Sequence, residues 1–299
     1  MRLELHLSYA CPQACAFCSE AERMALFRDR PVTTREIARV LAEKRRQGFD
    51  HLTLTGGEPT AHPDFLGSLR AARSLGYRTY VTSNGIRLAQ SSFAARALPL
   101  IHELCLSLHG EREVHERLTG VPGSFERLLE AFRNAKGFAG VYLLANTVVT
   151  AWNWSSLEKI LEMVFGLGAR HWLVSNLAPE GRGALRFREL AVPLADWRRR
   201  IPDLARLAEG RGNLRFFGLP LCVLGPYQEL SNDLYFSPRV TVERARGPAG
   251  LAETPSPAPT RNRVQPRSCA GCAARRLCGG VFERYAREFG TSELEPVHG

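Results

Sequence analysis

The chain has 299 residues, of which 44% are hydrophobic and 23% charged, an ordinary composition for a globular protein that buries a full core. No apolar run approaches the roughly 18 residues of a membrane span and no export signal opens the chain, so no membrane partner is expected. The net charge of +10 comes almost entirely from arginine, since the only lysines are Lys44, Lys136 and Lys159. We interpret this preference for arginine over lysine as an effect of genome composition, and no nucleic-acid partner is expected.

The first 217 residues alternate short apolar strands with amphipathic helices. The expected strands are 3–8, 51–55, 77–83, 103–108, 141–149 and 171–177. The expected helices are 33–48, 64–75, 124–136 and 155–167, the first opened by a Thr cap with an acidic residue in its first turn and the third capped by Ser124. Six such repeats predict an α/β fold, a partial (β/α)6 barrel with a parallel sheet inside and helices outside.

The composition changes in the last third of the chain. Residues 246–262 are rich in Pro, Gly and Ala and are predicted to form a loop or flexible segment. A compact cysteine cluster and a predicted helix over 281–289 follow. The sequence therefore predicts two domains, the barrel over 1–217 and a small cysteine-rich domain over 218–299.

Cys11, Cys15 and Cys18 follow the first expected strand in a C-x3-C-x2-C pattern. Without an export signal the compartment is expected to be cytoplasmic and reducing, which favours metal ligation over disulfides. A zinc site would need a fourth ligand, and we interpret nearby His6 as structural. A [4Fe–4S] cluster can use three thiolates and leave one iron open to a small molecule. A chance cluster or a zinc knuckle is the alternative.

With Phe17 before its third cysteine, this stretch resembles the cluster motif of the radical S-adenosylmethionine (radical SAM) superfamily. The turn Gly56–Gly57–Glu58–Pro59, one β/α unit later, resembles the GGE motif of the same family. The resemblance implies that S-adenosylmethionine chelates the open iron and that its amino group is bound at this turn, where Glu58 can accept from an ammonium. It also implies cofactor contacts from polar residues at later strand ends, namely Ser83, Asn84, Ser107 and Asn146.

A second cysteine group, Cys269, Cys272 and Cys278, has C-x2-C-x5-C spacing, and Cys222 is a candidate fourth ligand. The group resembles part of the auxiliary-cluster region called SPASM, or its shorter twitch form. It lacks the further cysteines of the full pattern, so the resemblance implies one auxiliary [4Fe–4S] cluster in addition to the first. Zinc is the competing interpretation. The eighth cysteine, Cys105, is expected to be a buried apolar residue.

The resemblance implies an enzyme that cleaves S-adenosylmethionine reductively to a 5′-deoxyadenosyl radical, which abstracts a substrate hydrogen. An external one-electron donor such as flavodoxin or ferredoxin would supply the electron, and the auxiliary cluster would transfer electrons or bind substrate. The sequence does not single out a catalytic side chain. Weak candidates for substrate contact are His109, His115, Asn176 and Arg182.

The main substrate hypothesis is a small polar molecule. The alternative is a peptide maturase acting on a ribosomally made precursor. Because the chain starts directly at its first strand, a maturase would need a separate partner to recognise the peptide or another way to dock it. A third hypothesis, a zinc-stabilised binding protein without catalysis, leaves the Glu58 motif unexplained.

Overall fold

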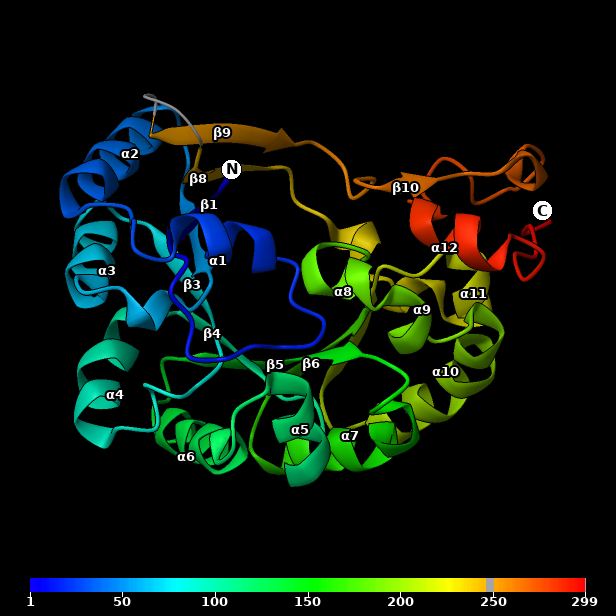
Figure 1. Ribbon diagram of the computed structural model, residues 1–299, viewed down its shortest axis with the longest axis horizontal. Helices are drawn as coiled ribbons and strands as arrows, with labels where there is room; N and C mark the ends of the chain where they lie inside the picture. The colour runs from blue at the N-terminus through cyan, green and yellow to red at the C-terminus, as the bar shows by residue number, and fades with distance from the viewer. Residues whose placement is uncertain (246–249, 299) are drawn as a thin grey trace.

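Nine strands form one curved sheet in the computed structural model, which describes residues 1–245 and 250–298 (Figure 1). The strands lie in the order β7-β6-β5-β4-β3-β2-β1-β8-β9, so the sheet is an open, partial barrel. Neighbours from β7 to β8 pair in parallel, and β9 is antiparallel to β8. Their bounds are β1 (Arg2–Ser8), β2 (His51–Gly56), β3 (Arg78–Ser83), β4 (Glu103–Ser107), β5 (Tyr142–Val149), β6 (His171–Asn176), β7 (Asn213–Phe217), β8 (Arg239–Arg244) and β9 (Leu251–Ser256).

Helices cover the outer side of the curved sheet, as Figure 1 shows for α2, α3, α4, α6, α7 and α10. Parallel strands need such crossover connections, which places the helices outside and leaves the inner side of the sheet free. The helices are α1 (Ala21–Phe27), α2 (Thr34–Arg46), α3 (Phe65–Ser74), α4 (Ser91–Ala97), α5 (Arg112–Thr119), α6 (Ser124–Lys136), α7 (Leu157–Gly166), α8 (Gly181–Leu185), α9 (Phe187–Leu190), α10 (Leu194–Ala208), α11 (Leu221–Leu224) and α12 (Glu283–Phe289).

Helix α2 begins where the sequence predicts, and its start has a local cause. The Thr33 hydroxyl accepts from the Glu36 N–H, and the Glu36 carboxylate accepts from the Thr33 N–H, which completes a capping box. At α6 the prediction needs correction: Ser124 is the first helical residue, and the N-cap is Gly123 with φ 72°. A glycine adopts this left-handed conformation without the steric cost that a Cβ brings.

The sheet is larger than the six expected repeats, because β7, β8 and β9 extend it at both ends. Within the predicted loop over 246–262, residues 246–249 lie outside the described residues, and 251–256 form β9. The prediction of a loop is therefore wrong for β9. Proline removes a backbone donor, yet Pro255 is tolerated there because β9 is the edge strand of the sheet.

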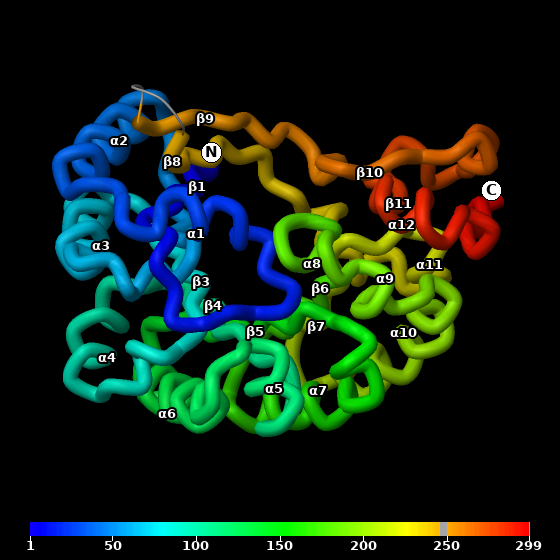
Figure 2. The backbone as a smooth tube through the Cα atoms, viewed as in Figure 1, coloured from blue at the N-terminus to red at the C-terminus, as the bar shows by residue number. Residues whose placement is uncertain are grey.

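The cysteine-rich tail follows β9 and contains a two-stranded ladder, β10 (Arg263–Val264) with β11 (Val281–Phe282) (Figure 2). A buried ion pair ties it to the rest of the protein, since the Arg263 guanidinium lies 2.5 Å from the Asp233 carboxylate. The guanidinium also lies over the rings of Phe217 and Phe282, at 5.3 and 5.1 Å from their centroids. Because β8 and β9 continue the barrel sheet, the predicted boundary after residue 217 stays a prediction.

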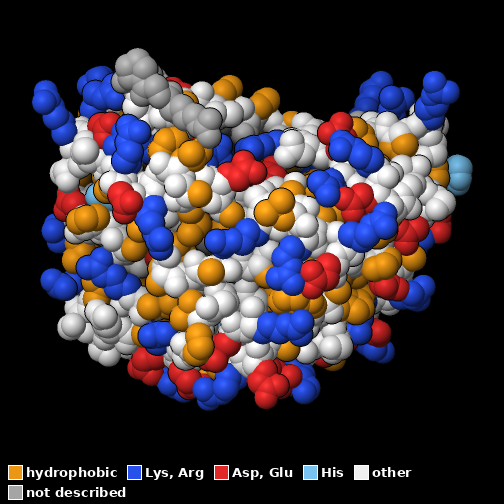
Figure 3. Space-filling view, viewed as in Figure 1, with side chains coloured by type: hydrophobic (Ala, Val, Ile, Leu, Met, Phe, Trp, Pro, Cys, Tyr) orange, Lys and Arg blue, Asp and Glu red, His pale blue; other side chains and the backbone are white. Residues whose placement is uncertain are grey.

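Basic and acidic side chains are interspersed on the face shown in Figure 3. In the densest basic run, Arg198 to Arg200 on α10, each arginine is paired with an acidic side chain. Arg198 pairs with Glu295, Arg199 with Asp196 and Arg200 with Glu158. In residues 1–245 and 250–298, no helix is long and apolar enough to cross a membrane.

Candidate functional site

The first cysteine group lies on the loop between β1 and α1. The backbone of α5 holds this loop, because the Ala14 and Ala16 N–H groups each donate at 2.8 Å to the last carbonyls of that helix. Within the loop, the Cys18 N–H donates to the Cys15 carbonyl at 3.2 Å. The chain therefore brings Cys11, Cys15 and Cys18 together at the carboxyl end of β1, where β/α folds carry their active-site loops.

The three thiols have polar neighbours suited to sulfur ligands. The Cys11 sulfur accepts from the Gln13 N–H at 3.4 Å and from the Asn84 amide at 3.7 Å. The Cys15 thiol contacts the Gln13 side-chain oxygen at 3.6 Å, and the Cys18 thiol contacts Met24 Sδ at 3.8 Å. The thiols thus have separate partners, and among the described residues no three His, Cys, Asp or Glu side chains form a group that could hold a metal ion as they stand.

Burial raises the pKa of Cys11 to about 11 and also raises the pKa of Cys15 and Cys18. As free thiols, all three are therefore protonated at neutral pH. A bound metal reverses this, since a coordinating thiol loses its proton. Three thiols on one loop, with two N–H donors aimed at the Cys11 sulfur, fit the ligand set of an iron–sulfur cluster with one open iron.

The glycine turn after β2 packs directly against this loop. The Gly57 N–H donates to the Ser8 carbonyl at 2.7 Å, and the Glu58 N–H donates to the Ala10 carbonyl at 3.0 Å. Gly56 has φ 121°, and a Cβ there would lie 2.4 Å from the Ser8 carbonyl oxygen. The turn therefore needs glycine, because two backbones approach too closely for a side chain.

The Glu58 carboxylate is buried and points into the protein. Its Oε1 accepts from the Thr60 N–H, the Thr60 hydroxyl and the Ser83 hydroxyl, at 2.6 to 3.0 Å. Its Oε2 accepts from the Asn84 N–H at 2.8 Å. Burial raises the pKa of Glu58, and these donors oppose that rise. Glu58 thus joins the turn after β2 to the end of β3, and the expected contact with an ammonium stays a prediction.

Two other expected cofactor contacts lie on neighbouring strands. Ser107 and Asn146 are directly paired between β4 and β5. The Asn146 side-chain oxygen accepts from the Ser175 hydroxyl at 2.7 Å. Asn146 also lines the cavity on the inner side of the sheet, so its amide lies where a ligand inside the barrel would meet it.

The expected substrate histidines are buried and packed against other side chains. His109 lies 4.6 Å from Phe17, ring centroid to centroid, and its Nδ1 accepts from the Val148 N–H at 3.2 Å. His115 accepts from the His109 N–H at 3.2 Å through its own Nδ1. Burial lowers the pKa of His115 to about 4 and lowers that of His109. Both rings are neutral and support the loop that carries Phe17.

Asn176 and Arg182 make contacts with backbone carbonyls. The Asn176 amide donates to the Gly218 carbonyl at 3.1 Å, which ties the end of β6 to the segment before α11. The Arg182 N–H donates to the Cys18 carbonyl at 2.9 Å. Arg182 therefore belongs beside the first cysteine group.

A cavity of about 630 Å³ lies inside the curved sheet. Its walls are inward-facing strand residues two positions apart, such as Thr53 with Thr55 and Tyr80 with Thr82, as strand geometry dictates. Cys105 also lines it, so this buried cysteine faces the cavity. Ser19 on the cysteine loop and Gly56 on the glycine turn border the same cavity. Both motifs thus border one cavity.

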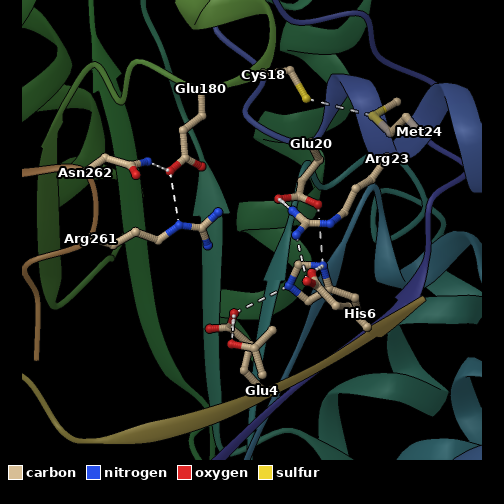
Figure 4. A network of polar contacts seen from close by, with 11 residues as sticks. Glu4, His6, Cys18, Glu20, Arg23, Met24, Glu180, Arg261 and Asn262 are labelled. Carbon is tan, nitrogen blue, oxygen red and sulfur yellow. Dashed lines mark hydrogen bonds and ion pairs between the residues drawn. The ribbon is translucent and has the colours of Figure 1, made fainter. Parts of the chain in front are cut away.

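A charged cluster on the cavity wall was not predicted from the sequence (Figure 4). His6 lies 3.4 Å from Glu4, 3.5 Å from Glu20 and 3.9 Å from Glu243, and Arg23 contacts Glu243 at 2.6 Å. Burial disfavours the imidazolium, but the carboxylates of Glu20 and Glu4 outweigh it and raise the pKa of His6 to about 9. The alternation of Glu4 and His6 along β1 was the available sequence signal, while Glu243 comes from a distant strand.

The second cysteine group also comes together. Cys222, Cys269, Cys272 and Cys278 line one small, enclosed cavity between α11 and the tail. Burial raises the pKa of Cys222 to about 11 and raises that of Cys269. The fold thus brings Cys222 to the three tail cysteines, and its role as a fourth ligand stays a prediction.

Backbone N–H groups point at two of these sulfurs. Cys278 accepts from the Leu221 N–H at 3.4 Å and the Gly280 N–H at 3.3 Å, and Cys272 accepts from the Val297 N–H at 3.3 Å. Hydrogen bonds to sulfur tune the potential of iron–sulfur clusters and orient ligands in metal sites. Four cysteines with such donors fit either an iron–sulfur cluster or zinc.

Known proteins resemble this chain in sequence. Residues 5–164 match the family described as the Radical SAM superfamily. The chain is 31% identical over 218 residues to the PqqA peptide cyclase of Ruegeria pomeroyi, covering 72% of this chain and 57% of that protein. It is 30% identical over 193 residues to a probable GTP 3′,8-cyclase of Saccharolobus islandicus, covering 62% of this chain and 60% of that protein. The chain thus spans little more than half the length of these relatives.

Among solved structures, the fold resembles Streptococcus suis SuiB bound to S-adenosylmethionine. The TM-score is 0.68 and the sequence identity 19%, and the match covers 100% of this chain and 76% of that one. At this identity the likeness establishes the fold, a partial barrel with a tail beyond it.

Proposed function

Because the chain belongs to the Radical SAM superfamily, we propose that it is an enzyme that uses S-adenosylmethionine and a [4Fe–4S] cluster to modify a peptide. The observation that carries the proposal is the contact between the two motifs. The glycine turn is hydrogen-bonded to the residues just before Cys11, and both motifs border one cavity. This arrangement suits a cofactor held at the cavity rim and a substrate held inside.

Cys11, Cys15 and Cys18 would hold the cluster, and the backbone at Gly56 and Gly57 would bind the methionine end of S-adenosylmethionine. When bound, this pair supplies one-electron cleavage of the sulfonium to a 5′-deoxyadenosyl radical that takes a hydrogen atom from the substrate. The protein orients the cofactor and excludes bulk water from the cavity. An external one-electron donor such as flavodoxin or ferredoxin would be the redox partner.

The charge of the cavity favours a peptide over a nucleotide. A nucleoside triphosphate requires a surplus of cationic groups, because its phosphates carry several negative charges. The cavity wall instead carries four carboxylates and four guanidinium groups, and the imidazolium of His6 leaves a surplus of only one positive charge. The carboxylates are Glu4, Glu20, Glu103 and Glu243, and the arginines are Arg2, Arg23, Arg239 and Arg261. The 31% identity to a protein named PqqA peptide cyclase supports the same choice.

A small polar molecule is the second candidate. The 30% identity to a probable GTP 3′,8-cyclase favours it, and this likeness covers nearly as much of the chain. The two candidates differ in what the reconstituted protein consumes together with S-adenosylmethionine.

For the tail we propose an auxiliary [4Fe–4S] cluster held by Cys222, Cys269, Cys272 and Cys278, within a small domain over 218–299. Four cysteines around one cavity leave no ligand position open, which favours electron transfer over direct substrate binding. Zinc is the competing occupant, and metal analysis separates the two.

Anaerobic reconstitution tests both sites. The wild-type protein is expected to bind about eight irons per chain, four for each [4Fe–4S] cluster, and the triple variant Cys11→Ala, Cys15→Ala, Cys18→Ala about four. Cys222→Ala should also lose iron from the tail site, whereas Cys105→Ala should retain all of it. Colourless protein with stoichiometric zinc would contradict the proposal.

Substrate class is tested next. The reconstituted protein is incubated with S-adenosylmethionine, dithionite and either GTP or synthetic peptides encoded by short reading frames beside its gene. A mass change in a peptide together with 5′-deoxyadenosine formation supports the proposal. Consumption of GTP with every peptide unchanged would favour the second candidate.

A further inference from the structure

The segment after β6 packs closely on the first cysteine loop. The Arg182 N–H donates to the Cys18 carbonyl at 2.9 Å. A Cβ on Gly181 would lie 2.3 Å from the Cys18 carbonyl oxygen, and a Cβ on Gly183 would lie 3.2 Å from the Phe17 carbonyl oxygen. The two backbones therefore touch, and Arg182 is held at this contact by a glycine on each side.

The Arg182 side chain also turns toward the cysteines. Its Nη1 donates to the Cys15 carbonyl at 3.4 Å. Arg186, four residues on, is instead paired with Glu189 at 2.7 Å. Arg182 thus directs its charge at the loop that carries the sulfurs.

The other end of the same segment is tied to the tail (Figure 4). Glu180 accepts from the Asn262 amide at 2.5 Å and lies 3.4 Å from the Arg261 guanidinium. The segment is therefore anchored on both sides, and Arg182 has little freedom to move away from the cysteines.

We propose that Arg182 is a positioning residue that places a fixed positive charge beside the first iron–sulfur site and so raises the reduction potential of a cluster bound there. The inference rests on the proposed cluster at Cys11, Cys15 and Cys18. Reduction adds one negative charge to a cluster, and a nearby cation stabilises the reduced form more than the oxidised form. The main-chain hydrogen bond of Arg182 does not depend on its side chain. Gln removes the charge and Lys keeps it, while both lose the guanidinium contact with the Cys15 carbonyl, so the two variants together separate the charge from that contact.

The test is a redox titration of the full-length, reconstituted protein followed by electron paramagnetic resonance. Arg182→Gln should shift the reduction equilibrium of the first cluster by about tenfold, a potential about 59 mV lower for one electron. Arg182→Lys keeps the charge and should remain near the wild-type potential. Arg188→Gln is the matched control, because Arg188 is exposed and lies 3.8 Å from Glu288. The first cluster is identified as the signal missing from the Cys11, Cys15, Cys18 triple variant.

An unchanged potential in fully loaded Arg182→Gln would overturn the inference while leaving the proposed function intact. An equal fall in the Gln and Lys variants would also overturn it, because charge would then not be the cause. If Arg182→Gln binds too little iron, the Lys variant decides: full loading supports the role of charge, and an equal loss of iron contradicts it. A wild-type protein that binds no cluster at these cysteines would contradict the proposed function itself.

Discussion

The backbone N–H of Glu58 donates to the backbone carbonyl of Ala10 across 3.0 Å. This bond joins the glycine turn after β2 to the residue that precedes Cys11. Two motifs that are separated in the sequence therefore form one structural unit, because β1 and β2 are parallel neighbours whose carboxyl ends meet. A substitution in the turn is therefore expected to alter the conformation of the cysteine loop.

Gly56→Ala should destabilise the protein. Its φ of 121° disfavours a side chain, and the new Cβ would lie 2.4 Å from the Ser8 carbonyl oxygen. We expect a loss of about 1–3 kcal/mol in the free energy of unfolding, measured with urea. Gly140→Ala is the control, since a Cβ at that position would meet no atom of a more distant residue within 4 Å. Equal stability of the two variants would contradict the close approach of the backbones.

Glu58→Gln should weaken the junction between β2 and β3. The carboxylate accepts four hydrogen bonds from Thr60, Ser83 and Asn84, and an amide would turn an N–H2 group toward one of these donors. A buried donor left without an acceptor costs about 1–3 kcal/mol, which thermal and urea unfolding should detect. Glu113→Gln, at an exposed position on α5, should change stability by less than about 0.5 kcal/mol. A wild-type value for Glu58→Gln would contradict the described network.

The charged cluster around His6 predicts a pH dependence of stability. The pKa of His6 is raised from 6.5 to about 9 in the folded protein, by the carboxylates of Glu20 and Glu4 against the effect of burial. A raised pKa means that the folded state binds the proton more tightly. The stabilisation of the folded state by protonated His6 is therefore complete below pH 6.5 and is lost as the pH rises through about 9.

His6→Gln should remove this dependence. The difference in unfolding free energy between wild type and variant, measured with urea at several pH values, should be largest at about pH 6 and shrink toward about pH 9 and above. His51→Gln, at the start of β2 beside Asp50, is the matched control outside the cavity. A difference that stays constant over this range would show that His6 is not charged.

Asp233→Asn should loosen the tail. It leaves the Arg263 guanidinium buried without its carboxylate, and the two side chains are only 2% and 3% exposed. Breaking a buried pair by removing one partner costs about 3–5 kcal/mol. Hydrogen exchange in residues 257–282 should accelerate. Asp203→Asn is the control, because its partner Arg206 is exposed, and it should lower the free energy of unfolding by about 0–1 kcal/mol. If the tail stayed protected from exchange in both variants, the ion pair with Arg263 would not be what tethers it.

Features encoded by neighbouring residues could be predicted from the sequence. The capping box of α2 and the parallel strands β1 to β6 each depend on a short local pattern. The first three cysteines and the glycine turn are also short local motifs. The structure places them at the carboxyl ends of the adjacent strands β1 and β2. The structure places Cys222 beside the tail cysteines, and its role as a fourth ligand stays a prediction.

Features that depend on distant pairing could not be predicted in this way. Strand β9 is short, exposed and contains Pro255, so its sequence resembles a loop, and its pairing with β8 decides its conformation. The charge on His6 depends on Glu20 as well as on its neighbour Glu4, and only the fold brings Glu20 near. Arg182 was expected to face substrate, but its contact with the cysteine loop depends on how closely two glycines allow the backbones to approach.

The antiparallel edge strand β9 has a practical consequence for dissecting this protein. By reversing the direction of the chain, it delivers Thr254, Ser256 and Arg261 to the wall of the inner cavity. A truncated chain that stops before β9 would therefore lose part of the cavity wall as well as the tail cysteines. The contribution of the second cysteine group has to be measured with point substitutions, because a deletion would alter the inner cavity and the cysteine group at once.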